Sequence, residues 1–241
     1  MRAWYGAFVG SLVLAVFGLV LGGRTTDARA QAAEAPLDAA AVVGLVQSFY
    51  DQTTTFEAEF HQTQFTKIYN RTERANGRVV FKKPGMMRFD YAQPNGQVFV
   101  CDGRTLQIYQ PPDEGESAGQ LIERPVQSDQ LPAAFGFLMG TGRLDRDFTV
   151  RLLDPQREGF PGGYVLELRP RQASPHYDRL LFFVQVVTEQ GRRAGVLRRV
   201  LIVDAAGNRN RFDFQRPQFN RQVPASRFRY TPPRGTRRVR P

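Results

Sequence analysis

The residue types that most often perform catalysis or bind metals are few in this sequence. Among its 241 residues are two histidines, His61 and His176, which are far apart and belong to no metal-ligand spacing. The single cysteine, Cys101, has no histidine pattern that would pair it with a base, so an inert, half-buried thiol is the better interpretation. The sequence also lacks a G-x-S-x-G turn, a phosphate-binding loop and an H-E-x-x-H motif. We therefore predict a protein that is not an enzyme and has no metal or other cofactor.

The segment GRVVFKKPGMMRFDYAQP (77–94) indicates a different chemistry, the binding or packing of apolar groups. Two β-rich runs flank Lys82-Lys83-Pro84-Gly85, and each run alternates with the period of a strand. Arg88 and Asp90 lie on one face of the second run. The other face carries Val79, Phe81, Lys83, Met87, Phe89 and Tyr91. This oily face must pack on a protein core or enclose an apolar guest.

The charge pattern suggests nucleic acid as a partner, but the alternation argues against it. The net charge is +10, and nearly all the positive charge is arginine. Phe212, Phe214, Phe228 and Tyr230 alternate with Arg211, Arg227 and Arg229. Strict alternation places rings and arginines on opposite faces, whereas a stacking groove for bases needs both on one surface. We therefore expect a buried ring face, a solvated arginine face and no nucleic-acid partner.

Residues 1–30 have the pattern of a signal peptide. Arg2 precedes an apolar run over 4–21, and Ala28-Arg29-Ala30 forms a small-x-small cleavage box before Gln31. The alternative is a retained membrane anchor, because 18 apolar residues could just span a bilayer. Since Cys101 is the single cysteine, the exported protein can form no internal disulfide and must be stabilised by its core.

The elements that position the oily face are two amphipathic helices and a series of strands. Asp38 is the expected cap of the first helix, whose apolar stripe is Ala41, Val42, Leu45, Val46, Phe49 and Tyr50. Ser128 is the expected cap of the second, over 128–142, with Leu131, Phe135, Leu138 and Met139 on one side and Gly140 and Gly142 ending it. Expected strands cover about 56–61, 65–69, 77–83, 86–92, 97–101, 104–109, 148–153, 163–169, 179–187, 196–203, 208–215 and 227–231.

The order of these elements predicts an antiparallel meander in a single domain over 31–241. The Pro- and Gly-rich acidic stretch 110–120 is expected to be a mobile loop. The Pro- and Arg-rich tail, 236–241, is expected to fray.

Four blocks together resemble the periplasmic outer-membrane lipoprotein carrier family, of LolA type. They are FEAEFHQ (56–62), GRVVFKKPGMMRFDYAQP (77–94), VCDGRTLQIYQP (100–111) and FRYTPPRG (228–235), in this order, and the resemblance covers roughly 45–235. It implies a mainly β fold, a half-open antiparallel barrel covered by short amphipathic helices. It also implies a periplasmic monomer that takes acylated lipoproteins from an inner-membrane ABC exporter and passes them to an outer-membrane acceptor.

The resemblance also assigns residues to the interior of the barrel. The implied lipid-binding residues are Phe60, Val79, Phe81, Met87, Phe89, Tyr91, Phe135, Leu138 and Met139. Plain core packing is the alternative for each of them. Lys83 stands where the family commonly has an arginine that holds the lid shut from inside, so lid closure is its implied role. Lysine offers a point charge and no planar fork of donors, so this replacement is not neutral.

Three other functions fit parts of the pattern. One is a periplasmic module of the same barrel fold that senses lipid or lipoprotein and signals to a partner. The others are a basic nucleic-acid binder and a carrier anchored by its uncleaved leader.

The leader gives the first testable prediction. We expect N-terminal sequencing of the exported protein to begin at Gln31, because Ala28 and Ala30 form the cleavage box. A membrane-bound product that begins at Met1 would show that the leader is retained as an anchor.

Overall fold

The computed structural model describes residues 36–126, 133–140, 142–189 and 191–239. The chain divides into two compact units, Met1–Pro36 and Leu37–Pro241, and every element named below belongs to the second. The expected signal peptide and the expected helix cap Ser128 lie outside the described residues. Within the described ranges, no helix is long and apolar enough to cross a membrane.

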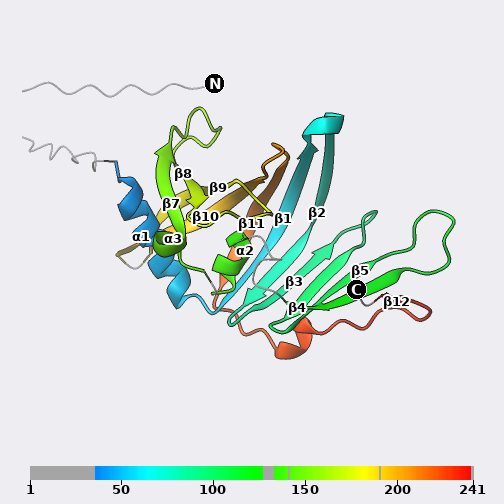
Figure 1. Cartoon of the computed structure of the whole chain (residues 1–241). Helices are drawn as coiled ribbons and strands as arrows, with labels where there is room; N and C mark the ends of the chain where they lie inside the picture. Colours follow the sequence, from blue (N-terminus) through cyan, green and yellow to red (C-terminus); the bar gives the residue numbers. More distant parts are fainter. Residues whose placement is uncertain (1–35, 127–132, 141, 190, 240–241) are drawn as a thin grey trace, which may run out of the picture. The chain divides into compact units, whose positions relative to one another are not determined.

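The fold is mainly β, as predicted, and consists of one open sheet with a few short helices (Figure 1). In the described residues the sheet has twelve strands, in the order β12-β6-β5-β4-β3-β2-β1-β11-β10-β9-β8-β7. All neighbours pair antiparallel except β12 and β6, which are parallel. The strands are β1 Thr55–Thr66, β2 Arg71–Lys82, β3 Met86–Tyr91, β4 Val98–Asp102, β5 Thr105–Gln110, β6 Gln120–Pro125, β7 Phe148–Leu153, β8 Tyr164–Pro170, β9 Arg179–Glu189, β10 Arg192–Val203, β11 Arg209–Phe219 and β12 Arg237–Val239.

The helical segments are short, apart from the first. They are α1 Ala39–Gln52, η1 Lys67–Tyr69, α2 Ala133–Leu138, α3 Leu144–Asp147 and η2 Ala225–Phe228. The Asp38 side chain accepts a hydrogen bond from the Ala41 N–H at 2.7 Å, so the predicted cap is confirmed. α1 ends where Thr53 takes an extended conformation, also as predicted.

The hairpin β1–β2 forms the centre of the sheet because both strands are long and their apolar positions coincide. The register pairs Phe56 with Phe81 and Ala58 with Val79, on one face. Opposite Phe60 stands Gly77, where a Cβ atom would lie 2.1 Å from the Asp90 carbonyl oxygen. Only glycine fits at this point, because the strands β1 and β3 approach it so closely.

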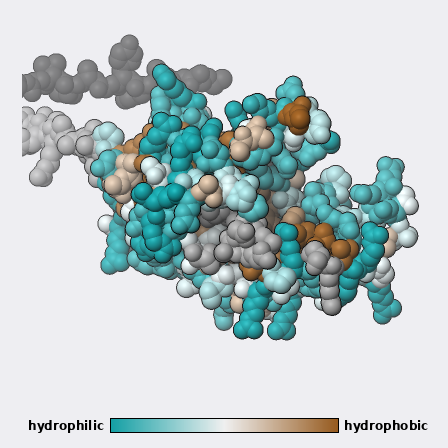
Figure 2. All heavy atoms as spheres, in the orientation of Figure 1, coloured by the Kyte–Doolittle hydropathy of each residue, from teal (hydrophilic) through white to brown (hydrophobic). Residues whose placement is uncertain are grey.

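The tip of this hairpin is η1, where Ile68 and Tyr69 are 82% and 76% exposed. Figure 2 shows hydrophobic surface there and over the region of β3–β5, within a face that is otherwise mostly hydrophilic.

Several expected boundaries differ in the structure. β6 is absent from the expected strands, yet it pairs with β5 from Gln110↔Gln120 to Thr105↔Pro125. The expected strand over 227–231 is replaced by η2, which ends at Phe228. Residues 237–239, expected in a frayed tail, form β12, because the edge of β6 offers free backbone groups that pair with Arg237–Val239. The mobility of the 110–120 loop stays a prediction.

The outer face of the sheet is covered by the C-terminal segment. Val80, Val100, Val223 and Phe228 form a buried cluster there, with Tyr230 packed against it. The Lys82 ammonium donates to the Val223 carbonyl at 2.6 Å and ties this segment to β2. The rings predicted for the core, Phe212 and Phe214, are buried on the inner face.

A buried carboxylate on β8 joins three strands. Glu167 is only 4% exposed and accepts hydrogen bonds from Arg151 on β7 and, at 3.3 Å, from Arg169. Arg179 on β9 lies 3.6 Å away. The hydrogen bond from Arg151 lowers the pKa of Glu167 below its usual value, against the opposing effect of burial.

We expect Glu167→Gln to lower the free energy of unfolding at pH 7 by about 1–3 kcal/mol, because it gives three arginines a neutral amide with one acceptor oxygen in place of their shared carboxylate. The native pKa of Glu167 is depressed, so its contribution is full above its unfolded pKa and is lost as the pH falls through the native pKa. Urea unfolding at pH 7 and pH 3 should therefore show a difference between wild type and variant that shrinks in acid. Glu116→Gln, in the exposed loop after β5, is the matched control and should leave the free energy of unfolding unchanged at pH 7 and at pH 3.

Candidate functional site

The inner face of the sheet presents two continuous apolar rows across β2–β5. Strand pairing places Phe81, Met87, Cys101 and Leu106 side by side in the first row. The second row is Val79, Phe89, Phe99 and Ile108. Alternation in each of the four strands thus builds one oily surface that a single strand could not provide.

The helix α2 lies over this surface and is held by aromatic contacts. The ring of Phe135 is centred 5.7 Å from that of Phe81, 5.2 Å from that of Phe89 and 5.3 Å from that of Phe212. On the other side, the ring of Phe137 lies 5.3 Å from that of Tyr50 on α1. α2 therefore joins α1 to the rings of the inner face.

Beside α2 is an open cavity of about 440 Å³. Its apolar lining consists of Met87, Phe89, Tyr91, Phe99, Leu106, Ile108, Phe135 and Phe212. Its polar lining consists of Gln62, Gln64, Glu73, Asn95, Gln97, Arg124 and Asn210. Burial raises the pKa of Tyr91 to about 12, while a hydrogen bond with Gln62 acts in the opposite direction. Rings and methionine thus form the inner wall, and amides form much of the remainder.

The predicted interior residues divide between this cavity and the core. Met87, Phe89, Tyr91 and Phe135 line the cavity. Phe60, Val79, Phe81, Leu138 and Met139 belong to the buried core that supports it. Sequence reasoning did not single out Phe99, Leu106, Ile108, Phe212 or Arg124 as lining residues. The alternation of β4 and β5 was the signal for three of them, since their inward positions continue the rows that begin on β2 and β3.

Lys83 lies where the ends of two helices meet the β2–β3 turn. Its ammonium donates to the Tyr50 carbonyl in the last turn of α1. Its aliphatic stem packs on Gly140, where a Cβ atom would come within 2.8 Å of Lys83 Cδ. Two residues on, the Gly85 N–H donates to the Met139 carbonyl at 3.2 Å, just after α2. The side chain thus has the inward direction that the strand alternation predicted and an acceptor at the end of α1, and its role in closing the lid stays a prediction.

The charge of Lys83 is shaped by this partly enclosed position. Desolvation lowers its pKa from the ordinary lysine value, and the nearby Asp51 carboxylate opposes that shift. A cation at the C-terminal end of α1 also complements the partial negative charge of the helix carbonyls.

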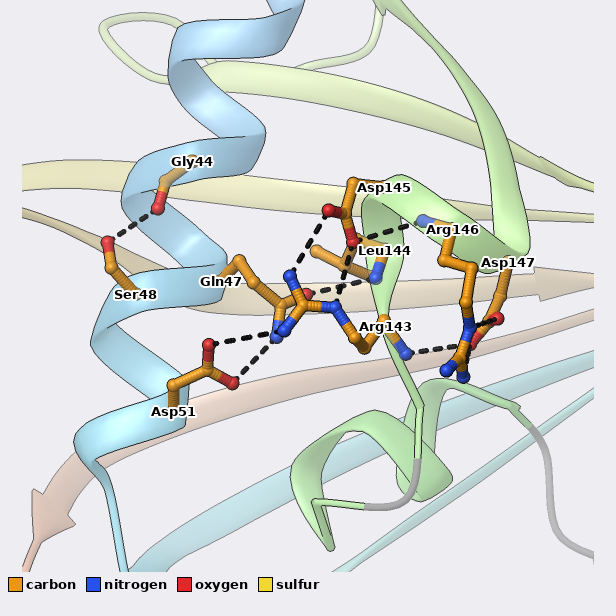
Figure 3. A network of polar contacts seen from close by, with 9 residues as sticks. All are labelled: Gly44, Gln47, Ser48, Asp51, Arg143, Leu144, Asp145, Arg146 and Asp147. Carbon is orange, nitrogen blue, oxygen red and sulfur yellow. Dashed lines mark hydrogen bonds and ion pairs between the residues drawn. The ribbon is translucent and has the colours of Figure 1, made fainter.

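A second polar contact holds the segment after α2 against α1 (Figure 3). The side-chain oxygen Oε1 of Gln47 accepts a hydrogen bond from the Leu144 N–H at 3.0 Å in a buried position, and its side-chain Nε2 donates to Asp51 at 2.8 Å. Arg143 forms ion pairs with Asp145 at 3.1 Å and Asp51 at 3.9 Å around this bond. The segment after α2 is therefore bonded to α1 at Gln47, while the end of α2 is bonded to the β2–β3 turn at Gly85, beside Lys83.

Of the residues with catalytic potential, Cys101 lies in the first apolar row of the inner face. His61 and His176 are exposed on the surface. Burial raises the pKa of Cys101, whose thiol donates to the Gly85 carbonyl at 3.2 Å. No group of three or more potential metal ligands occurs among the described residues.

Replacement of Lys83 tests its contact with α1. In Lys83→Leu we expect amide exchange in the last turn of α1 to become roughly five- to tenfold faster, as for one lost hydrogen bond of about 1 kcal/mol. The effect is limited because the Tyr50 carbonyl also accepts the Thr53 N–H at 3.1 Å. Lys82→Leu is the matched control: its ammonium bonds on the outer face, so α1 should be unaffected. Equal protection of α1 in wild type and Lys83→Leu would refute the contact.

Comparisons with known proteins show the family to which the chain belongs. The family model described as outer membrane lipoprotein carrier protein LolA matches residues 51–231. An outer-membrane lipoprotein carrier protein of Cupriavidus pinatubonensis is 30% identical over 207 residues, which are 85% of this chain and 90% of that protein. One of Chromobacterium violaceum is 30% identical over 214 residues, 88% of this chain and 93% of that protein.

A solved structure of a LolA superfamily protein from Nitrosomonas europaea is 16% identical and gives a TM-score of 0.44, with 81% of this chain and 99% of that chain covered. The family match extends from the end of α1 to the segment after η2 and includes the strands that line the cavity. By this match and by its identity to these relatives, the chain belongs to the LolA family of outer-membrane lipoprotein carrier proteins.

Proposed function

We propose that this protein is a periplasmic chaperone that shelters the acyl chains of lipoproteins in its cavity and carries them from the inner to the outer membrane. Its relatives are named outer-membrane lipoprotein carrier proteins, which supports the role. The observation that carries the proposal is the cavity beside α2, whose inner wall is made of eight apolar side chains. The proposed role requires no catalytic activity.

The size of the cavity suits a cargo that is held but not trapped. Each buried methylene group contributes about 0.8 kcal/mol, so even part of one acyl chain binds appreciably. A volume of about 440 Å³ is in the range of pockets that enclose one small ligand. Further acyl chains would need α2 to move away from the inner face, which would expose Phe135 and the rings beneath it.

The contacts between the end of α2 and the β2–β3 turn explain how this helix could move away from the inner face and return. Cargo that displaces α2 would break the Gly85–Met139 hydrogen bond and the packing of Lys83 on Gly140, and their re-formation would compete with bound lipid when cargo is released. Met87 in the wall and Met139 at the end of α2 are adaptable side chains that can follow apolar groups of different shape. The partners in this cycle would be an inner-membrane ABC exporter and an outer-membrane acceptor, and the carrier would act as a monomer.

A matched pair of variants on β4 tests the cavity. Phe99 lines it, and its neighbour Val98 packs on the outer face, and both side chains are half-buried. We expect Phe99→Glu to weaken binding of a synthetic triacylated lipopeptide at least tenfold, because the new carboxylate must lose water when acyl chains fill the cavity.

Val98→Glu places the same charge on the opposite face and should bind the lipopeptide as wild type does. Circular dichroism of both variants checks that they are folded. Equal lipopeptide affinity for wild type, Phe99→Glu and Val98→Glu would mean that acyl chains bind elsewhere.

A further inference from the structure

The cavity wall contains a charged side chain that acyl chains leave unmatched. Arg124 on β6 lines the cavity, beside its strand partner Leu106 on β5. The Nε atom of Arg124 is fully enclosed and has no hydrogen-bond partner in the described part of the chain. A buried donor without an acceptor is costly, and more so when it is charged. Because protein atoms cover Nε, an acceptor that enters the cavity meets the terminal nitrogens of this guanidinium, whose charge no described residue pairs.

The carboxylates closest to Arg124 in the sequence and in the lining are already engaged elsewhere. Glu73, the other charged lining residue, forms an ion pair with Arg71 at 2.7 Å near the exposed end of β2. Glu123 precedes Arg124 on β6, so it faces outward, where it accepts from Gln107 at 2.8 Å and pairs with Arg238 at 3.0 Å. Arg124 thus contributes a positive charge to the apolar wall that neither of these carboxylates balances.

Strand register places this charge near one end of the cavity. Arg124, Leu106, Cys101 and Met87 form one cross-strand row. Tyr91, whose N–H donates to the Gln97 carbonyl at 2.9 Å, lies four residues further along β3, a distance of roughly 13 Å. The cavity therefore has a guanidinium toward one end, amides toward the other, and rings and methionine between them.

We propose that this cavity also binds single-chain lipids that end in a carboxylate, with the carboxylate on Arg124 and the hydrocarbon against Met87, Phe89 and Leu106. The two terminal nitrogens of a guanidinium present parallel N–H donors, which match the two oxygens of a carboxylate. The ligand proposed for Arg124, a free fatty acid, differs from lipoprotein cargo because its chain ends in an ionised carboxylate. Both would occupy the same cavity.

The test compares dodecanoate with 1-dodecanol, which has the same chain length and no charge. Each would displace the neutral fluorophore N-phenyl-1-naphthylamine from the exported protein at pH 7.5. We expect wild type to bind dodecanoate about ten- to a hundredfold more tightly than the alcohol, as for a charge-assisted hydrogen-bonded pair. Arg124→Gln should lose that preference and keep its affinity for 1-dodecanol.

Two further variants make the result specific. Arg124→Lys keeps the charge without the fork, so it should retain a smaller preference for dodecanoate. Arg104→Gln removes an exposed arginine just before β5 and should behave as wild type. If Arg124→Gln fails to bind the fluorophore, the preference for dodecanoate over 1-dodecanol is compared between Arg124→Lys and wild type. An equal preference in these two proteins would then overturn the inference.

Equal affinity of wild type for the acid and the alcohol would overturn the inference, and so would an undiminished preference in Arg124→Gln. The triacylated lipopeptide separates this outcome from the proposed function. Lipopeptide binding by wild type together with no preference for dodecanoate would overturn the Arg124 site alone. Binding of dodecanoate without binding of the lipopeptide would support the site and contradict the carrier role.

Discussion

Tyr50 is the residue through which the helices, the sheet and the β2–β3 turn are joined. Its hydroxyl accepts the Leu197 N–H of β10 at 3.2 Å, so α1 is fixed to the sheet by a buried hydrogen bond. Burial raises the pKa of this phenol far above its usual value, which keeps it neutral. Its ring contacts Phe137 of α2, and its carbonyl accepts the Lys83 ammonium. A shift of Tyr50 would therefore alter its ring contact with α2 and its hydrogen bond with Lys83 at the same time.

The cavity exists because the two faces of the sheet are covered to different extents. The outer face of β2–β4 is sealed by the C-terminal segment, in which Val223 and Phe228 are buried. On the inner face α2 has only six residues, about 9 Å of helix, and covers part of a surface to which seven strands contribute. The uncovered remainder is an apolar wall, which natural monomers rarely leave exposed without a use.

The alternation of residues predicted most of this arrangement, since it depends on local geometry. Asp38 as a helix cap, the strand period of 77–91 and the inward direction of Lys83 follow from the positions of neighbouring residues. β6 and β12 could not be predicted in this way. Their sequences are polar, and they are strands because a partner strand lies beside them in space.

Sequence alternation also fails to separate the residues that line the cavity from those that pack in the core. Phe81 and Phe89 have the same pattern in sequence, yet only Phe89 reaches the cavity, because Phe135 and Phe56 pack around Phe81. Arg124 gave no signal at all, since an arginine on a polar strand is ordinary. Its significance comes from the register that sets it beside Leu106.

The single thiol of the protein has a consequence for observing its motion. Cys101 is buried beneath the β2–β3 turn and bonds to the Gly85 carbonyl, and the N–H of Gly85 is in turn held by Met139. Any opening that separates α2 from this turn loosens the cover of the sulfur atom. The rate at which a thiol reagent modifies Cys101 in the native protein therefore reports how often that opening occurs. Because the sequence has a single cysteine, no second thiol contributes to the measured rate and no label has to be introduced.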